Sequence, residues 1–339
     1  MYREEQEHKE VNALRKKLLL FGIVCTVIVS TLVTGCFSEP KPKPAPVPAN
    51  STAYLTIKDS TGRTVTLPQK PSRVILLSAS FVDLFYSVDG KAIGRPSSKT
   101  ESIPKMALSV PEVGFVYNIN LEKLVALKPD LVIGVQGLHE KLVPSMESSQ
   151  IPIVILRYKT LEDTIEITRM MGNIAGTQAK AAQVIDTTQS KIQETIAKLP
   201  VNRRVKVAIL HATAKSVTVE LDTTIAGSIA KEIGLINIAA GSVPVNADND
   251  AIPYSMERLV EADPDIMFVV TMGDKVEIEK RMRADVESNP AWSSLRAVQQ
   301  KKVYFLPSEL FLLNPGLRMP EAVEYMAKLV YPEVYGSGK

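Results

Sequence analysis

The sequence predicts an α/β protein of two lobes, each built on a parallel-type sheet, joined by a long connecting helix. Three observations predict this fold class: short continuous apolar runs, helical patterns between them, and a segment that occurs twice. With 339 residues, 45% of them hydrophobic and 23% charged, the chain has room for about two globular domains. A formal charge of +3 gives no support to nucleic-acid binding, for which a strongly basic cluster would be expected.

The first 36 residues differ in composition from the rest. A polar segment ends in basic residues, an apolar run occupies residues 18–33, and Cys36 follows shortly after it. This run of 16 residues is shorter than the roughly 20 that a spanning helix needs, and the basic flank is typical of a secretory signal peptide. The ending resembles the bacterial lipoprotein box, which implies that residues 1–35 are removed and that Cys36 carries a lipid. The alternative is an uncleaved N-terminal membrane anchor, and both interpretations place the remainder outside the cytoplasmic membrane.

Cysteine and proline usage agree with an exported, anchored protein. Cys25 lies in the apolar run and would leave with it, so Cys36 would be the only cysteine left and no internal disulfide could form. Residues 36–53 include five prolines between Pro40 and Pro48, a spacing that favours extended polyproline II. We therefore expect a lipidated Cys36 followed by a semi-rigid tether.

Six apolar runs predict strands that are buried on both faces, because apolar and polar residues do not alternate in them. Three fall in a predicted N-terminal lobe of residues 54–160. Three more fall in a predicted C-terminal lobe of residues 200–339, which ends in a helix. The runs are residues 73–78, 131–134, 153–156, 205–210, 266–270 and 303–306.

One segment repeats between the two lobes. Residues 121–133 (LEKLVALKPDLVI) and residues 256–268 (MERLVEADPDIMF) agree at five of thirteen positions without a gap. In each copy a Pro-Asp pair is expected to end a helix and to start a strand, since proline cannot continue the helix. The repeat therefore predicts two lobes of similar topology.

The segment between the lobes, residues 161–199, has a helical pattern. Thr160 predicts its N-cap. Gly172 and Gly176 are expected to interrupt it, and Thr177 is expected to cap a second helix of roughly 34 Å at 1.5 Å per residue. A helix of this length would join the lobes stiffly, and the cleft between them is the expected binding site.

No catalytic motif is present. The sequence contains no phosphate-binding loop, no G-x-S-x-G nucleophile elbow, no H-E-x-x-H zinc motif and no cysteine cluster. After removal of the signal segment only His139 and His211 remain, so a metal site of three histidines cannot form. These absences favour a binding protein over an enzyme, without catalytic residues, an intrinsic cofactor or an assigned metal site.

Several motifs together resemble the substrate-binding proteins of ABC importers, and within them the branch that binds ferric siderophores, haem and cobalamin. This resemblance covers about residues 54–331 and implies two Rossmann-like lobes, no enzymatic activity, and an ABC permease with its ATPase subunits as partners. The segments that carry it are Asn120 to Ile133 (NLEKLVALKPDLVI), Val113-Gly114, Asn289-Pro290-Ala291-Trp292, and Asn314-Pro315-Gly316-Leu317-Arg318, with Leu317 where the branch has a second proline.

The resemblance also implies a docking surface. In this family one glutamate on each lobe contacts arginines of the permease, and the matching positions are Glu122 and Glu257. Asn120 and Ser255 look like helix N-caps, which would place each glutamate in a first helical turn. The alternative is that both glutamates only complement the helix dipole, an effect worth about 0.3–1 kcal/mol.

Ligand-binding residues are expected beyond the carboxyl ends of the strands, where pockets of parallel α/β lobes form. Haem-binding relatives use an axial Tyr, His or Met, and basic side chains would meet the carboxylate arms of a siderophore. The candidate residues are Tyr117, His139, Tyr158, His211, Tyr254, Met272, Arg95 and Arg157. The segment 219–229 resembles a region where some haem binders place an axial histidine, which this chain lacks.

The predicted function is a lipid-anchored receptor at the outer face of the cytoplasmic membrane, or in the periplasm. It would capture an iron chelate, with a ferric siderophore ranked before haem and cobalamin, and deliver it to the permease. We expect it to be a monomer. The remaining alternatives are a cobalamin receptor of the same family, an exported two-lobe enzyme, or a sensor that binds a ligand without transport.

Overall fold

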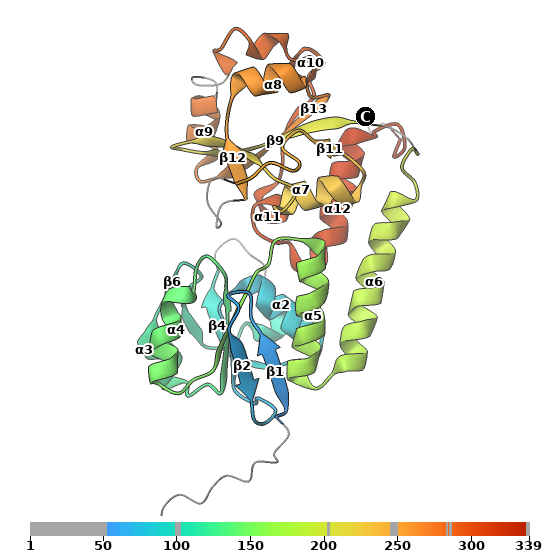
Figure 1. Ribbon diagram of the computed structural model, residues 1–339. Coiled ribbons are helices and arrows are strands. Elements are labelled where there is room, and N and C mark those ends of the chain that lie inside the picture. Colours follow the sequence, from blue (N-terminus) through green and yellow to red (C-terminus); the bar gives the residue numbers. More distant parts are fainter. Residues whose placement is uncertain are drawn as a thin grey trace, which may run out of the picture. The chain divides into compact units, whose positions relative to one another are not determined.

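The computed structural model describes residues 53–98, 103–201, 204–244, 250–282, 284 and 287–336. The signal segment, Cys36 and almost all of the tether lie outside the described residues, so their processing stays a prediction. Residues 52–339 form one compact unit, and the described part of this unit contains two six-stranded sheets with helices packed on them (Figure 1).

The N-terminal lobe is built on a sheet of order β6-β5-β4-β3-β7-β8, in which only the β5–β6 pair is antiparallel. An antiparallel pair of strands, β1 (Leu55–Lys58) and β2 (Thr64–Leu67), precedes it. The strands of the sheet are β3 (Val74–Leu76), β4 (Ala92–Ser97), β5 (Glu112–Phe115), β6 (Asn118–Ile119), β7 (Leu131–Val135) and β8 (Ile153–Leu156). The helices of this lobe are α2 (Ala79–Ser87), η1 (Lys105–Ala107), α3 (Leu121–Ala126), η2 (Glu140–Leu142) and α4 (Val143–Ser148).

The C-terminal lobe has a mixed sheet of order β12-β10-β9-β13-β14, with β11 also paired to β9. The β12–β10–β9 part is antiparallel, and the other pairs are parallel. Its strands are β9 (Lys206–Thr213), β10 (Val217–Glu220), β11 (Ile236–Asn237), β12 (Ala251–Pro253), β13 (Ile266–Met272) and β14 (Val303–Phe305). Its helices are α7 (Ile225–Glu232), α8 (Met256–Ala262), α9 (Lys275–Met282), η4 (Trp292–Ser294), α10 (Arg296–Gln299), α11 (Ser308–Phe311), η5 (Gly316–Arg318) and α12 (Met319–Val330).

Both sheets are buried on their two faces, as the continuous apolar runs predict. In β3, Val74 and Leu76 belong to one apolar cluster, whereas Ile75 belongs to a different cluster. In β13, Phe268 and Met267 are divided between two clusters in the same way. Because side chains alternate along a strand, each central strand contributes to an apolar layer on either side of its sheet. All six predicted strands are present, and the α/β two-lobe prediction is confirmed.

The internal repeat corresponds to a repeated helix–strand unit, α3–β7 and α8–β13. The side chain of Asn120 accepts a hydrogen bond from the backbone N–H of Lys123 at 2.9 Å, and Ser255 accepts one from Arg258 at 3.3 Å. Both predicted N-caps are therefore confirmed.

The repeated aspartates have equivalent roles that the sequence comparison did not reveal. The Asp130 carboxylate accepts a hydrogen bond from the backbone N–H of Arg73 at 2.8 Å, and the backbone N–H of Asp130 donates one to the Arg73 carbonyl. Asp265 and Lys206 make the same reciprocal pair, with the side-chain contact at 2.9 Å. Each aspartate thus joins the start of its own strand to the start of the neighbouring central strand.

Two helices connect the lobes. Helix α5 (Leu161–Ala175) begins with a capping box formed by Thr160 and Asp163, as predicted for its N-terminus. Helix α6 (Gln178–Ile196) lies against α5 and against α12 of the C-terminal lobe (Figure 1). Ala181 of α6 belongs to the N-terminal core and Ile192 to the C-terminal core. Helix α6 therefore connects the two cores, over roughly 28 Å at 1.5 Å per residue.

The structure corrects three details of this connection, the first being the length of α6, roughly 28 Å where roughly 34 Å was expected. Gly172 does not interrupt α5 but lies inside it, and a Cβ atom there would come within 2.4 Å of the Ala181 Cβ. Because Gly172 has no Cβ atom, α5 and α6 can approach each other closely at this position. Gly176 ends α5 in the left-handed conformation, at φ +69°. The predicted interruption of the helical segment at Gly176 is therefore confirmed. Thr177 occupies the N-cap position of α6, but its hydroxyl donates to the Val88 carbonyl instead of capping the helix.

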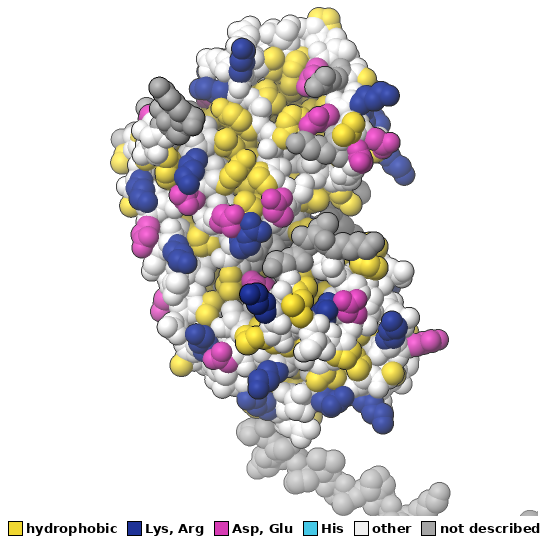
Figure 2. Space-filling model, turned by 180° about the vertical axis from the view of Figure 1, so that it is seen from behind, with side chains coloured by type: hydrophobic (Ala, Val, Ile, Leu, Met, Phe, Trp, Pro, Cys, Tyr) yellow, Lys and Arg dark blue, Asp and Glu magenta, His cyan; other side chains and the backbone are white. Residues whose placement is uncertain are grey.

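The described surface agrees with the balanced composition. On the face drawn in Figure 2, Lys and Arg side chains are interspersed with Asp and Glu side chains over most of the area. Within the described ranges, no helix combines the length and the apolar character that a membrane crossing would need.

Candidate functional site

A cavity of about 670 Å³ lies between the lobes. From the N-terminal lobe it is lined by the start of α2 and by Pro104, and from the C-terminal lobe by the end of β13, the start of α11 and the segment 312–318. The start of α2 follows β3 and the start of α11 follows β14, so the cavity lies beyond the carboxyl ends of central strands in both lobes. This is the location expected for a ligand site in parallel α/β lobes.

A smaller cavity of about 210 Å³ adjoins the first, since Leu312 lines both. It contains His211, one of the predicted ligand residues, at the end of β9. The His211 Nδ1 lies 2.9 Å from the buried carboxylate of Glu220, which also accepts the Thr224 hydroxyl at 2.8 Å. A carboxylate partner of this kind fixes the orientation of an imidazole ring.

A buried asparagine connects the two lobes at the larger cavity. The Asn314 carbonyl accepts the hydroxyl of Ser80 on α2 at 3.0 Å, and its amide donates to Thr164 on α5 at 3.4 Å. Its side-chain oxygen accepts the Gly316 N–H at 2.8 Å. Gly316 has φ +60°, a conformation that glycine adopts without strain. The segment that contains Asn314, which the sequence analysis used only for the family resemblance, therefore lines the cleft and contacts both lobes.

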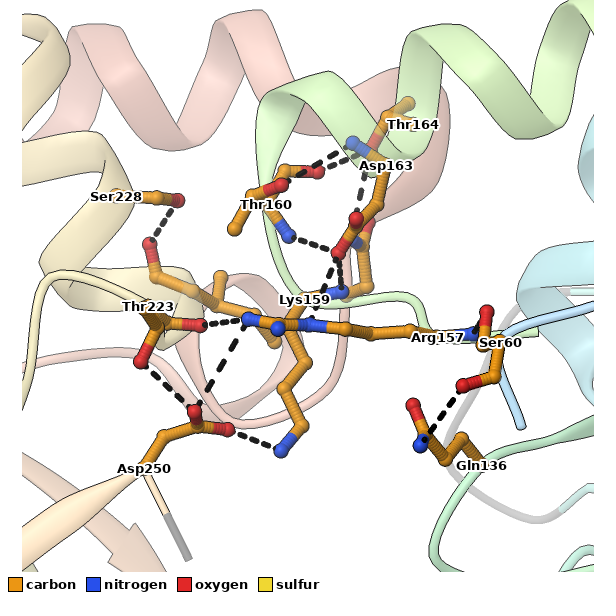
Figure 3. A network of polar contacts seen from close by, with 12 residues as sticks. Ser60, Gln136, Arg157, Lys159, Thr160, Asp163, Thr164, Thr223, Ser228 and Asp250 are labelled. Carbon is orange, nitrogen blue, oxygen red and sulfur yellow. Dashed lines mark hydrogen bonds and ion pairs between the residues drawn. The ribbon is translucent and has the colours of Figure 1, made fainter. Parts of the chain in front are cut away.

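A second connection between the lobes is ionic (Figure 3). Lys159, just after β8, forms an ion pair with Asp250, just before β12. Arg157 donates to the Thr223 carbonyl at 3.2 Å and lies within 4.0 Å of the Asp250 carboxylate. The Thr223 hydroxyl donates to the same carboxylate at 2.7 Å. The predicted ligand residue Arg157 is thus engaged in a bridge between the lobes, together with Asp163 at 3.7 Å.

This bridge predicts a pH-dependent stability. Burial alone would raise the pKa of Asp250, but hydrogen bonds from Lys159 and Thr223 and the nearby charge of Arg157 hold that pKa below its usual range. A lowered pKa in the folded state contributes stability above the unfolded value of about 4, which is lost as the pH falls through the folded value. We expect Asp250→Asn to lower the free energy of unfolding by about 1 kcal/mol at pH 7, because solvent screens the partly exposed partners.

The measurement is urea unfolding of both proteins between pH 7 and pH 3. The difference between wild type and Asp250→Asn should shrink as the pH falls, while the exposed Asp186→Asn on α6 should show no comparable loss at any pH. A difference that stays constant over this range would contradict the role of the ion pair.

Two of the predicted ligand residues are buried and engaged within the chain. Arg95 is 7% exposed, donates to the Ala107, Pro96 and Leu108 carbonyls, and forms an ion pair with Glu112 at 2.9 Å. His139 is 1% exposed, and its Nδ1 accepts the Val135 N–H at 2.9 Å. Its Nε2 lies 2.7 Å from the Val116 carbonyl. In this geometry neither side chain offers a free group to a ligand.

The candidate tyrosines Tyr158 and Tyr254 lie in apolar surroundings. Tyr158 is buried against Phe81 with ring centroids 5.3 Å apart, and burial raises the pKa of its hydroxyl well above the usual range. Burial raises the pKa of Tyr254 to about 12, and its hydroxyl donates to the Met256 sulfur at 3.7 Å. Burial therefore disfavours the charged form of both phenols in the described structure.

The other two candidates are exposed. Tyr117 is 70% exposed and stacks on Phe115 with ring centroids 5.8 Å apart. Met272 is 57% exposed at the end of β13, next to the cavity residues Thr271 and Gly273. Within the described ranges no group of three or more His, Cys, Asp or Glu side chains is arranged to hold a metal ion.

The sequence analysis missed two charged residues that line the larger cavity, Asp83 and Glu309. Asp83 is half-buried on α2, and burial raises the pKa of its carboxyl. Glu309 is exposed on α11. On sequence alone each resembles an ordinary polar position of an amphipathic helix, and no local signal sets them apart.

The predicted docking glutamates occupy matching positions on the two lobes. Glu122 and Glu257 are exposed in the first turns of α3 and α8, and neither forms an ion pair or hydrogen bond with a described residue. Three residues further along, Val125 and Val260 are 36% and 41% exposed. Because residues at this spacing share a helix face, each lobe presents an acidic and an apolar side chain together.

Comparison with known proteins agrees with this architecture. Residues 74–310 match the model of a family described as periplasmic binding proteins. The Fe(3+)-citrate-binding protein YfmC of Bacillus subtilis is 24% identical, over 93% of this chain and 97% of its own length. An uncharacterized ABC transporter substrate-binding lipoprotein of the same organism, YvrC, is also 24% identical, over 83% of this chain and 87% of its own.

A solved structure shows the same fold. The crystal structure of Staphylococcus aureus IsdE complexed with heme superposes with a TM-score of 0.66 at 23% identity, covering 76% of this chain and 98% of IsdE. The cleft between two α/β lobes, the helical connection and the match over most of the sequence lead to one conclusion. The chain belongs to the periplasmic binding protein family, whose members are non-enzymatic binding proteins of transporters.

Proposed function

We propose that this chain is the lipid-anchored, extracytoplasmic receptor of an ABC importer, which captures an iron chelate and delivers it to the permease. The observation that carries the proposal is the cavity of about 670 Å³ between the two lobes. Cavities of about 300–1,000 Å³ are typical of sites for small organic ligands. A siderophore complex or a porphyrin falls in this size class, while a bare metal ion would leave most of the space empty.

The names of the relatives support an iron chelate as ligand. YfmC is named for binding ferric citrate, and IsdE was crystallised with heme. At 23–24% identity these names support a class of ligand and no particular compound. The name of YvrC, a substrate-binding lipoprotein, supports the lipid anchor that the segment before Cys36 predicts.

Delivery to the permease rests on the paired glutamates. Glu122 and Glu257 occur at equivalent positions of the repeated unit, one on each lobe, and both are exposed. A permease that contacts both lobes at once would respond to a change in their separation, since the two contacts lie on different lobes. We therefore assign Glu122 and Glu257 to permease docking and the interlobe cavity to the ligand.

The test is co-elution of the detergent-solubilised protein with coloured ligands in gel filtration. The panel contains ferric hydroxamate and catecholate siderophores, ferric citrate, haemin and cobalamin, all of which absorb visible light. Retention of one iron chelate in about equimolar amount is the expected result. Retention of cobalamin alone would replace the iron chelate by a corrinoid, and retention of no compound would contradict the receptor function.

A further inference from the structure

The charged side chains that line the larger cavity are predominantly acidic. Within the described ranges they are Asp83, Glu309 and Arg318. The Arg318 guanidinium donates two hydrogen bonds to the Glu321 carboxylate, at 2.8 and 2.9 Å, so its charge is compensated within the chain. Asp83 and Glu309 form no hydrogen bond or ion pair with any residue in the described ranges. An incoming ligand would therefore meet the Asp83 carboxylate without a partner. It would also meet the Glu309 carboxylate, whose charge helps to raise the pKa of the Arg318 guanidinium that is already bound to Glu321.

Asp83 is the more informative of the two carboxylates. It lies on α2 among Val82, Leu84 and Phe85, which are fully or almost fully buried, and is itself half-buried. Burial raises the pKa of its carboxyl, which shows that the charged form is disfavoured where it stands. A carboxyl with a purely structural role at such a place would normally have a hydrogen-bond partner. A positive charge in the cavity would stabilise the ionised form.

Three described basic side chains near the cleft already have carboxylate partners, whereas Lys105, next to the cavity-lining Pro104, is exposed. Arg157 and Lys159 are bound to the carboxylates of Asp163 and Asp250, in and beside the smaller cavity. Arg95 forms an ion pair with Glu112, as described above. Binding of a carboxylate or catecholate there would have to break an existing ion pair.

The rest of the larger cavity is apolar or neutral. Leu312, Leu313, Pro104 and Pro315 line it, together with the hydroxyl-bearing Ser80, Thr271 and Ser308. Apolar walls and neutral hydrogen-bonding groups suit a ligand whose metal charge is already neutralised by its own donor atoms.

We propose that this cleft takes an iron chelate without net negative charge, either uncharged or cationic, and discriminates against chelates that carry free carboxylates. Three hydroxamate groups each supply one negative charge and neutralise ferric iron, so a chelate with an additional ammonium group is cationic. Citrate and haem both present carboxylates. The inference rests on the proposed receptor function and names the ligand class for the same cavity. It differs from the ferric citrate in the name of YfmC.

The test compares affinities by isothermal titration calorimetry of the detergent-solubilised full chain. The probes are ferrioxamine B, a cationic hydroxamate chelate, ferrichrome, an uncharged one, and ferric citrate and haemin as anionic ones. We expect ferrioxamine B to bind at least about tenfold more tightly than either anionic probe, because its ammonium group would form one unscreened charge contact with the Asp83 carboxylate. Asp83→Asn should weaken ferrioxamine B about tenfold and leave ferrichrome nearly unchanged.

The matched control is Asp89→Asn, which removes the same charge from an exposed residue just after α2 and outside the cavity lining. Its affinities should equal those of the wild type, and the thermal unfolding of both variants verifies their folding. Equal or tighter binding of an anionic chelate would overturn the inference and leave the receptor function intact. A cation preference that survives Asp83→Asn would overturn the role of this carboxyl. Binding of none of the four probes would contradict the receptor function itself.

Discussion

Charge reversal of both docking glutamates, Glu122→Lys with Glu257→Lys, is expected to abolish uptake of the ligand while leaving its affinity for the isolated protein unchanged. Both residues are exposed in first helical turns, one on each lobe, at equivalent positions of the repeated unit. Their distance from the cavity lining explains the separation of the two effects, because none of the residues of α3 or α8 lines either cleft cavity.

The magnitude follows from the energetics of interfacial charges. Removing one partner of a desolvated interfacial charge pair costs about 2–5 kcal/mol, so one reversal should weaken docking by more than about tenfold. Two reversals on opposite lobes should reduce uptake to background. The helix dipole contributes only about 0.3–1 kcal/mol for each residue, so the folded protein should survive the change with a small loss of stability.

The experiment measures uptake of a radioactive iron chelate by cells and binding of the same chelate by purified protein. Asp186→Lys with Glu194→Lys is a matched control, because both residues are exposed on α6 and the net change of charge is identical. Glu122→Gln with Glu257→Gln repeats the test without introducing positive charge at helix N-termini. Normal uptake by the reversed variant, or a parallel loss of ligand affinity, would refute the docking role.

The elements that could be predicted from the sequence are those whose signal is local. The strands β3, β7, β8, β9, β13 and β14 are continuous apolar runs, and in the central strands this pattern arises because both faces of each sheet are covered. The caps at Asn120, Thr160 and Ser255 are equally local, since each side chain bonds to the backbone three residues away. Strands β10 and β12 were missed because they are short and form by antiparallel pairing, β10 with β9 and β12 with β10.

The residues of the candidate site were harder to predict from the sequence. Burial and hydrogen-bond partners decide which side chains are free to bind a ligand, and the sequence shows neither. Arg95 and His139 have the residue types of ligand contacts, and only the packing of the loops around them shows that their polar atoms are occupied. Asp83 is the converse example, because it lines the cavity although nothing in the sequence of α2 marks it as a ligand-binding residue. Gly172 was interpreted as a break because its close neighbour, Ala181, lies on the next helix.

Substitution of the predicted lipidation site, Cys36→Ser, is expected to release the protein from the membrane. Cys36 follows a 16-residue apolar run, and a serine cannot form the thioether that carries the lipid. Each buried methylene of an acyl chain contributes about 0.8 kcal/mol to membrane binding, so an anchor with two or more chains is practically irreversible. Its loss should move nearly all of the protein to the soluble fraction. Uptake should fall with it, since the tether otherwise keeps the receptor at a high local concentration near the permease.

Cys25→Ser is the matched control, because it changes the only other cysteine of the chain, inside the segment that is expected to be removed. Fractionation, incorporation of radioactive palmitate and mass spectrometry of the N-terminus report on the same samples. Wild type and Cys25→Ser should both be labelled, lack residues 1–35 and stay with the membrane, while Cys36→Ser should lose the label. An unlabelled wild-type protein of full length that remains firmly bound to the membrane would show instead that residues 18–33 are kept as an anchor. In that case the receptor would still face outwards, but a transmembrane segment would replace the lipid.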